Sequence, residues 1–312
     1  MKIALHGDGA ETWAAALAGE PGVQVAIAGD GEGRTHEMED AEVLMGWRFP
    51  ESLLRLPKLR WIQLISVGAH DLVASPHLGS GVTITNTKGI YADSVADYMV
   101  WALLTLSRGL HRVILNQRRR RWRQVTAGGV SGKTLVVVGL GHIGAALAVR
   151  AQALGMRVVG VSRTAGAPVP EGIDRVVPFE AFGELLPACD ALAICAPLTA
   201  RTRGMVDGPA IARLKPGAIV VNVSPAELLD VQAVVGALRT GALAGAALDV
   251  FSQEPLSRWS RLWSVPNLLV TPHVSAITTD YRPRVARLMR ENLRRFQQGA
   301  PLLNVVDRTN GY

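Results

Sequence analysis

Short apolar runs alternate with helix-length or turn-like segments along the chain, and this spacing predicts an α/β protein built on parallel sheets. In the first part of the chain, the runs that predict strands are 2–6, 23–28, 42–46, 61–66 and 82–85. A second series follows, with predicted strands at 135–138, 157–161, 191–196, 218–223, 245–250 and 268–271. Helix-length segments separate most of these strands, as the crossover connections of a parallel sheet require.

A longer segment between the two series predicts a connecting helix. Over residues 94–123 the apolar positions keep helical spacing, and no proline interrupts them. A second long helix is predicted at about 283–298, followed by an extended, apolar tail at 301–306. The chain is therefore expected to cross once into a second domain and then to return.

The length of 312 residues fits two domains, each able to bury a core. We expect two Rossmann-like doubly wound α/β domains. A flavodoxin-like substrate domain would consist of residues 1–96 and 279–312. A dinucleotide-binding Rossmann domain, residues 97–278, would be inserted into it.

Composition predicts a globular protein of the cytoplasm. Apolar residues make up 48% of the chain and charged residues 19%, which argues against wholesale disorder. No run approaches the roughly 18 apolar residues of a membrane helix, and the first residues lack the apolar core of a signal peptide. The two cysteines, Cys189 and Cys195, are too few for a disulfide framework. A cytoplasmic location without a membrane partner is expected.

An excess of basic residues raises the question of a polyanionic partner. Lys and Arg number 33 against 26 Asp and Glu, a formal net charge of +7. Part of this excess lies in the run 118–123, Arg-Arg-Arg-Arg-Trp-Arg. The run is either a nucleic-acid-binding patch or the solvated basic end of the predicted connecting helix. The second interpretation is favoured, so no nucleic acid is expected, and the basic field would also attract anionic cofactors and substrates.

The segment 134–144, Thr-Leu-Val-Val-Val-Gly-Leu-Gly-His-Ile-Gly, is typical of a turn that binds the pyrophosphate of a dinucleotide. It follows a buried-strand pattern and precedes an alanine-rich helix pattern. Gly139 permits the tight turn, Gly141 lets the ligand approach the backbone, and Gly144 allows close packing of helix on strand. N–H groups at the helix start would bind phosphate. The candidate cofactor-binding residues here are Gly139, Leu140, Gly141, His142, Ile143 and Gly144.

The residues after the second strand of this unit indicate which dinucleotide is bound. About 20 residues beyond the glycine turn, an NAD-binding protein usually has an Asp or Glu that bonds the ribose 2′-hydroxyl. This chain has Ser162, Arg163 and Thr164 there instead. Arg163 can pair with a 2′-phosphate, which favours NADP(H) over NAD(H). The alternative is that Arg163 stacks on the adenine and that either cofactor is accepted.

Two later segments resemble a known enzyme family. They are 245–255, Gly-Ala-Ala-Leu-Asp-Val-Phe-Ser-Gln-Glu-Pro, and 270–276, Val-Thr-Pro-His-Val-Ser-Ala. With 61–69, 197–204 and 304–308, they make nearly the whole chain similar to the D-isomer-specific 2-hydroxyacid dehydrogenases. Within that family, the residues after the second strand and the ending 304–312 look most like bacterial glyoxylate and hydroxypyruvate reductases.

The resemblance implies a role for several residues. His273 would be the acid/base, oriented by Glu254, because the alkoxide formed on carbonyl reduction must gain a proton and histidine can supply one near neutral pH. Asp249 would lie near the nicotinamide amide. Further cofactor contacts would come from Ala196, Pro197, Val223, Ser224, Pro225 and Ala276. Backbone N–H groups of Val67, Gly68 and Ala69 would bind a substrate carboxylate. The resemblance also implies a homodimer formed through the cofactor domain, and it implies no metal site.

One position departs from the family pattern. After the strand at 218–223 the family places an arginine that grips the substrate carboxylate and polarises its carbonyl, but this chain has Pro225 there. Proline has neither charge nor N–H donor, and losing one such donor typically costs about 3–4 kcal/mol of transition-state stabilisation. Arg48 or Lys88 could replace the lost cation. Alternatively, the substrate lacks a carboxylate, or catalysis has been lost.

The sequence therefore predicts an NAD(P)H-dependent oxidoreductase that reduces a small carbonyl, either a 2-oxoacid or an atypical carbonyl or imine. The alternative is a catalytically silent dinucleotide-binding protein with a regulatory or interaction role. The presence of both Glu254 and His273 favours the reductase, since a binding module has no use for a proton relay.

Overall fold

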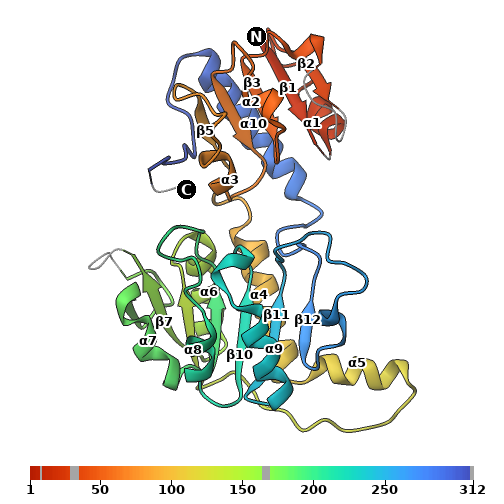
Figure 1. Ribbon diagram of the computed structural model, residues 1–312, viewed down its shortest axis with the longest axis vertical. Helices are drawn as coiled ribbons and strands as arrows, with labels where there is room; N and C mark the ends of the chain where they lie inside the picture. The colour runs from red at the N-terminus through yellow and green to blue at the C-terminus, as the bar shows by residue number, and fades with distance from the viewer. Residues whose placement is uncertain (8, 29–34, 164–168, 310–312) are drawn as a thin grey trace. The chain divides into compact units, whose positions relative to one another are not determined.

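The computed structural model describes residues 1–7, 9–28, 35–163 and 169–309. The chain divides into two compact units, and one is inserted into the other (Figure 1). The first unit consists of Met1–Ile90 and Thr278–Tyr312, and the second unit is Tyr91–Ile277. The chain thus enters the second unit at residue 91 and leaves it after residue 277. The sequence had predicted that this domain begins at residue 97 and ends at residue 278.

The first unit contains one parallel sheet of five strands in the order β2-β1-β3-β4-β5, the flavodoxin-like order. The strands are β1 Lys2–His6, β2 Gln24–Ala28, β3 Val43–Gly46, β4 Trp61–Leu64 and β5 Thr83–Thr85. The helices are α1 Ala10–Leu17, α2 Glu51–Leu54, α3 His70–Val73, α10 Tyr281–Gln297 and the 3-10 turn His36–Met38. All five strands predicted in this region are present. The helix predicted at 283–298 is also confirmed, as α10.

A buried polar network joins the end of the chain to this sheet. Asn292 of α10 is fully buried, and its amide donates to Gln63 Oε1 at 2.9 Å and to the Leu303 carbonyl at 3.1 Å. The Leu303 N–H donates to Asn292 Oδ1 at 2.7 Å. On the sheet, Thr85 Oγ1 donates to Gln63 Oε1 and accepts from Trp61 Nε1, each at 2.8 Å. Each of these buried polar groups therefore has a partner, as burial demands.

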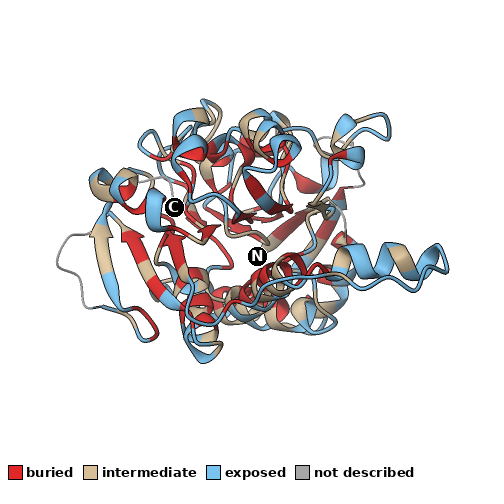
Figure 2. Ribbon diagram, turned by 90° about the horizontal axis from the view of Figure 1, so that it is seen from below, coloured by how far each residue is buried: buried red, intermediate tan, exposed pale blue. Residues whose placement is uncertain are grey.

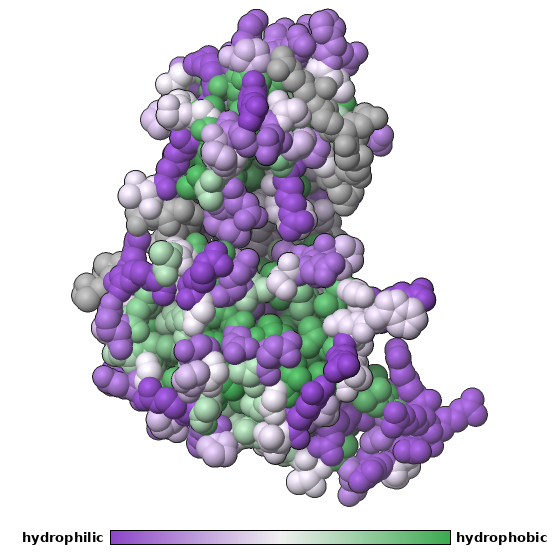
Figure 3. All heavy atoms as spheres, viewed as in Figure 1, coloured by the Kyte–Doolittle hydropathy of each residue, from purple (hydrophilic) through white to green (hydrophobic). Residues whose placement is uncertain are grey.

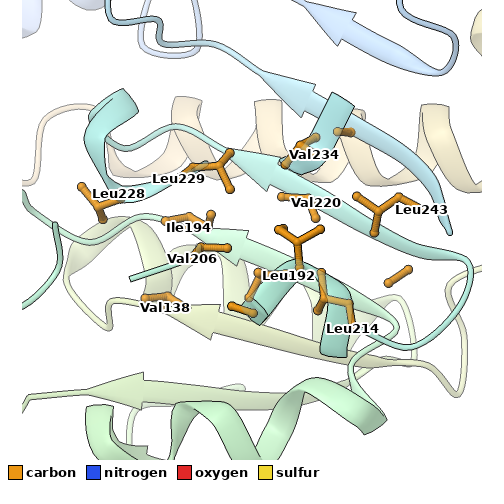
Figure 4. Packing of buried hydrophobic residues seen from close by; sticks show 14 of the residues in the cluster. Val138, Leu192, Ile194, Val206, Leu214, Val220, Leu228, Leu229, Val234 and Leu243 are labelled. Atoms are coloured by element: carbon orange, nitrogen blue, oxygen red, sulfur yellow. The ribbon is translucent and has the colours of Figure 1, made fainter. Parts of the chain in front are cut away.

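The second unit contains one parallel sheet of seven strands in the order β12-β11-β10-β9-β6-β7-β8. The strands are β6 Thr134–Val138, β7 Arg157–Ser162, β8 Arg175–Pro178, β9 Ala191–Ile194, β10 Ala218–Asn222, β11 Leu243–Leu248 and β12 Leu268–Val270. The central strands are buried, and their side chains pack with the flanking helices into one apolar core (Figure 4). The order reverses between β6 and β9, which is the point where doubly wound sheets bind ligands. Strand β8 was not predicted; it is short, lies at the sheet edge and has no buried residue.

The second unit has six α-helices within the described residues, of which all but α5 pack on or beside the sheet. They are α4 Ala92–Ser107, α5 Leu110–Arg118, α6 His142–Ala153, α7 Phe182–Leu185, α8 Gly208–Arg213 and α9 Val231–Thr240. The 3-10 turns are Phe179–Ala181, Leu186–Ala188, Ala226–Leu228 and Arg261–Ser264. Helix α4 packs along α6, and Arg150 of α6 pairs with Asp93 and Asp97 of α4 at 3.0 and 2.6 Å. Among the residues described, no helix is both long and apolar enough to span a membrane.

The single connecting helix predicted over 94–123 is wrong. Gly109, at φ 60° in the left-handed region, ends α4 and begins α5, so the chain changes direction there. Only Arg118 of the basic run is helical, and residues 119–123 follow the helix as an exposed segment. Most α5 residues are coloured as exposed in Figure 2, and none is buried.

We predict that Asn292→Ala lowers the free energy of unfolding by about 2–4 kcal/mol, because the N–H and the carbonyl of Leu303 lose their bonds to the buried amide and Gln63 Oε1 loses one of its two donors. Urea unfolding followed by circular dichroism measures this loss. Gln298→Ala, an exposed amide just after the same helix, is the matched control and should change stability by less than about 0.5 kcal/mol. Equal losses for the two variants would contradict the role given to Asn292.

Candidate functional site

The chemistry-bearing segments of the second unit follow the carboxyl ends of its strands. The glycine turn follows β6, Arg163 follows β7, residues 223–225 follow β10, Asp249 follows β11 and His273 lies beyond β12. All of these strands run parallel. Their carboxyl ends therefore share one edge of the sheet, and the five segments belong to one site region.

Two glycines of the turn are required because no Cβ would fit at their positions, whereas the third faces open space. Gly139 has φ 95°, and a Cβ there would lie 2.8 Å from backbone atoms of Cys195 and Ala196. A Cβ on Gly144 would lie 2.0 Å from the Gly139 carbonyl oxygen. By contrast, a Cβ on Gly141 would meet no atom within 4 Å. Helix α6 begins directly after Gly141, so the N–H groups of its first turn border this space, and the arrangement fits a pyrophosphate.

Cys195 supports the turn in a way that the sequence analysis did not foresee. Its thiol donates to the Gly139 carbonyl at 3.3 Å. Burial raises the pKa of the Cys195 thiol to about 12, so the proton needed for this bond stays in place at neutral pH. The only signal in the sequence was its position at the end of a predicted strand.

The residues predicted to distinguish NADP(H) from NAD(H) lie partly within the described chain. Ser162 is the last residue of β7, and Arg163 follows it at an exposed position. Thr164 lies outside the described residues. Neither Asp nor Glu occurs in the stretch 157–163, so no carboxylate of that stretch stands where an NAD-binding protein usually has one.

His273 and Glu254, which are 19 residues apart in the sequence, form a hydrogen-bonded pair. His273 Nδ1 donates to Glu254 Oε2 at 2.9 Å. The other oxygen of Glu254 accepts the Phe251 N–H at 2.9 Å, which fixes the carboxylate. The histidine side chain is 42% exposed and the glutamate 19%, so the imidazole reaches solvent while its partner is sheltered. The structure thus brings together the pair that the sequence analysis named.

The backbone of His273 adopts the left-handed region, with φ 53°, which non-glycine residues rarely occupy. Its N–H donates to the Asp249 carbonyl at 3.0 Å and to the Thr271 carbonyl at 3.1 Å. Because left-handed conformations are disfavoured for residues with a Cβ, they persist only where surrounding contacts fix them. The imidazole is therefore held in place by the fold as well as by Glu254.

Asp249 anchors the segment that carries His273. The side chain is fully buried. Its Oδ1 accepts the Thr271 hydroxyl at 2.5 Å and the Val274 N–H at 3.0 Å, and its Oδ2 accepts the Ser275 N–H at 2.9 Å. The family resemblance implied only a cofactor contact for Asp249, and nothing in the sequence indicated this anchoring role. A buried carboxylate must be met by donors, and the chain supplies them from the residues around His273.

The segment after β10 forms a closed turn that ends at Pro225. Asn222 Nδ2 donates to the Ser224 carbonyl, and the Ser224 N–H donates to Asn222 Oδ1, both at 3.1 Å. Ser224 is buried, and Val223 donates its N–H to the Ile194 carbonyl at 3.2 Å. Of the other predicted cofactor contacts, Ala196 is buried and Pro197 is exposed just after β9, and Ala276 is half-buried beyond β12.

The substrate-binding candidates belong to the first unit. Val67, Gly68 and Ala69 lie between β4 and α3, where the Val67 carbonyl accepts Asn86 Nδ2 at 2.8 Å. Arg48 follows β3, its guanidinium lies 4.7 Å from the Trp47 ring centre, and its carbonyl accepts His6 Nδ1 at 2.8 Å. Both groups lie at the carboxyl edge of the five-stranded sheet, beyond the ends of parallel strands.

Comparisons with known proteins agree with this fold. Residues 100–275 match the family model for the NAD-binding domain of D-isomer specific 2-hydroxyacid dehydrogenases. The glyoxylate reductase of Thermococcus litoralis is 33% identical over 267 residues, which cover 83% of this chain and 80% of that protein.

Two solved structures align along the whole chain. One is a D-isomer specific 2-hydroxyacid dehydrogenase from Xanthobacter autotrophicus Py2 in complex with NADPH and MES, 32% identical, with a TM-score of 0.87 over 100% of this chain and 99% of that one. The other is an NADPH-dependent glyoxylate/hydroxypyruvate reductase from Sinorhizobium meliloti in complex with NADP and sulfate, 26% identical, with a TM-score of 0.86 and the same coverage. The two-domain α/β fold and the predicted family are thereby confirmed. With its NAD-binding domain matched and its relatives aligned over most of their length, the chain belongs to the D-isomer specific 2-hydroxyacid dehydrogenase family.

Proposed function

We propose that this protein reduces a small carbonyl compound with NADPH and that His273 donates the proton. The observation that carries this proposal is the 2.9 Å hydrogen bond between His273 Nδ1 and Glu254 Oε2 beside a dinucleotide-binding edge. A bond at Nδ1 makes Nε2 the ring nitrogen that exchanges a proton with the substrate. Glyoxylate reductases among the relatives support a 2-oxoacid as the substrate.

The chain's own residues supply the proton chemistry of the reaction. A bound reduced nicotinamide would supply the hydride. The carbonyl oxygen gains negative charge as it is reduced, and His273 protonates it. Glu254, held by the Phe251 N–H, stabilises the positive charge of the imidazolium and keeps the ring in one tautomer. Asp249 fixes the backbone on which the ring is carried.

We predict that His273→Ala lowers kcat about 100- to 10,000-fold while the NADPH dissociation constant stays within about threefold of the wild-type value, because the ring acts on the substrate oxygen. NADPH oxidation across glyoxylate, hydroxypyruvate, simple aldehydes and imines measures the rate. Fluorescence titration measures cofactor binding. His36→Ala, an exposed histidine of the first unit, is the control. An unchanged rate in His273→Ala would remove His273 from its role.

The cofactor proposed is NADP(H), with NAD(H) possible. The glycine turn provides backbone donors and an open space at Gly141, and Arg163 provides a cation where NAD-binding proteins have a carboxylate. Structures of relatives bound to NADPH and NADP support this choice. The proposed contacts also include Ser162, Thr164, Ala196, Pro197, Val223, Ser224, Pro225, Asp249 and Ala276.

We predict that Arg163→Ala weakens NADPH binding about 10- to 100-fold and changes NADH binding less than about threefold, because only NADPH has the 2′-phosphate with which the guanidinium pairs. Arg157→Ala, at the other end of the same strand, is the matched control and should leave both affinities unchanged. Titration of each variant with NADPH and with NADH measures the two dissociation constants. Equal losses for NADPH and NADH would mean that Arg163 does not bind the 2′-phosphate.

Because Pro225 stands where the family has an arginine, the substrate can be bound in one of two ways. In the first, Arg48 or Lys88, at the carboxyl edge of the first unit's sheet, supplies the positive charge that the family's arginine provides, and N–H groups of residues 67–69 also bind the substrate carboxylate. In the second, the substrate has no carboxylate that must be bound. Pro225 also favours one rival function, a catalytically silent NADPH-binding regulatory protein. Tight NADPH binding without turnover of any compound in the panel would select that rival.

The protein is also proposed to form a homodimer through its second unit. Helix α5 has no buried residue, and its apolar side chains Leu110, Val113, Ile114 and Leu115 are 44%, 42%, 51% and 49% exposed. Trp122, beyond the helix, is fully exposed. In Figure 3 this projecting region is largely hydrophilic on the face shown, with apolar surface next to it. An apolar group of this kind in a helix is typical of a surface that a partner covers.

We predict that Ile114→Asp converts a dimer to a monomer, because it places a charge within the apolar contact. Sedimentation equilibrium across a range of protein concentrations measures the mass. Val149→Asp, a comparably exposed apolar residue on α6, is the matched control and should remain dimeric. A monomeric wild-type protein would refute the dimer, and a dimeric Ile114→Asp variant would exclude α5 from the interface.

A further inference from the structure

The segment 271–275, named here the histidine loop, depends on a buried group outside the loop. Asp249 accepts hydrogen bonds from Thr271, Val274 and Ser275, which flank His273 on both sides. Of these three donors, only the Thr271 hydroxyl can rotate away, since the other two are backbone N–H groups. A group that fixes that hydroxyl therefore adds to the two backbone bonds that already hold the histidine loop.

Tyr98 of helix α4 meets the Thr271 hydroxyl, although 173 residues separate the two in the sequence. The distance between Tyr98 Oη and Thr271 Oγ1 is 2.7 Å. The Thr271 hydroxyl has one hydrogen, and it gives this hydrogen to Asp249 Oδ1 at 2.5 Å. Tyr98 must therefore be the donor in its contact with Thr271. The three groups form a directed chain from Tyr98 through Thr271 to Asp249.

Burial and the nearby Asp249 keep the tyrosine in its donating form. Removal from water raises the pKa of the Tyr98 hydroxyl far above its ordinary value; the hydrogen bond with Thr271 acts against this rise, and the charge of Asp249 adds to it. The ring of Tyr98 packs beside that of Trp101, with ring centres 5.5 Å apart. This contact involves the ring alone, so phenylalanine at this position would preserve it.

We propose that Tyr98 is a positioning residue for His273, which it holds through Thr271 and Asp249. The Tyr98 hydroxyl orients the Thr271 hydroxyl toward the carboxylate. The carboxylate, with all three donors in place, holds Thr271 on one side and the Val274 and Ser275 N–H groups on the other, and with them the left-handed backbone of His273. Small misplacement of a proton donor slows a reaction without weakening ligand binding, because the alignment matters most in the transition state. This proposal rests on the proton-donating role proposed for His273.

The first experiment measures the stability of the histidine loop itself and needs no substrate. Hydrogen exchange of the intact protein, followed by mass spectrometry of peptides that cover 268–277, compares wild type with Tyr98→Phe. We expect amide exchange in this peptide to be about 5- to 30-fold faster in the variant, since one buried hydrogen bond is lost. Exchange in α6 and α9 should stay unchanged. Tyr281→Phe, which removes a hydroxyl from the other unit, is the matched control.

The second experiment measures the rate of the reaction. In Tyr98→Phe we expect kcat to fall about tenfold, KM and the NADPH dissociation constant to stay within about twofold, and the solvent deuterium isotope effect on kcat to rise as proton donation becomes slower. Thr271→Val should behave like Tyr98→Phe, and adding the second substitution to the first should cost little more. Thr271→Ser, which keeps the hydroxyl, should restore most of the rate.

Unchanged exchange in the 268–277 peptide would overturn the proposal, and so would equal gains in exchange throughout the second unit or parallel losses of kcat and NADPH binding. If Tyr98→Phe does not fold, the comparison of Thr271→Val with Thr271→Ser decides by the same criteria. Failure of the reductase function is distinguishable, because the exchange experiment on the loop then still gives its answer. A loop loosened by Tyr98→Phe in a protein that turns over no substrate would support the positioning contact and reject only the reaction.

Discussion

The burial of the Asp249 carboxylate is the constraint on which the arrangement of the candidate site depends. A carboxylate without water requires hydrogen-bond donors, and the donors come from the residues immediately around His273. The position of the imidazole is therefore determined by a group that need not touch the substrate. Glu254 then selects the orientation of the ring. Backbone position and ring orientation are fixed by two different carboxylates, from two different segments of the chain.

The parts of the fold that the sequence predicted well are those with local physical causes. Buried parallel strands are continuous apolar runs, so β9 and β10 could be found directly. The glycine turn could be found because its residue types follow from close packing. The break at Gly109 was missed because helical spacing of apolar residues continues across it. The anchoring role of Asp249 and the contact of Tyr98 with Thr271 could not be predicted, since a buried carboxylate finds its donors only in the folded chain.

The turn before Pro225 and the His273–Glu254 pair are held by separate sets of hydrogen bonds. The turn from Asn222 to Ser224 closes through its own side-chain and backbone bonds, so it does not need an arginine at position 225 to keep its shape. The His273–Glu254 pair likewise takes its geometry from Phe251 and Asp249. A change at residue 225 can therefore leave the geometry of the His273–Glu254 pair as it is. The His273–Glu254 pair belongs to the second unit, whereas Arg48 and Lys88 belong to the first.

The insertion of one unit into the other also has a consequence for the order of events during synthesis. The second unit is complete once residue 277 has left the ribosome, whereas the first still lacks α10 and the tail. Gln63 Oε1 of β4 can accept from Thr85 of β5 at that stage, but it gains its second donor, Asn292, only when α10 has been made. Because domains generally fold as units, the N-terminal sheet remains unfinished while the dinucleotide-binding unit folds after it. The five-stranded sheet, although made before the second unit, is thus among the last parts of these two units to reach its final structure.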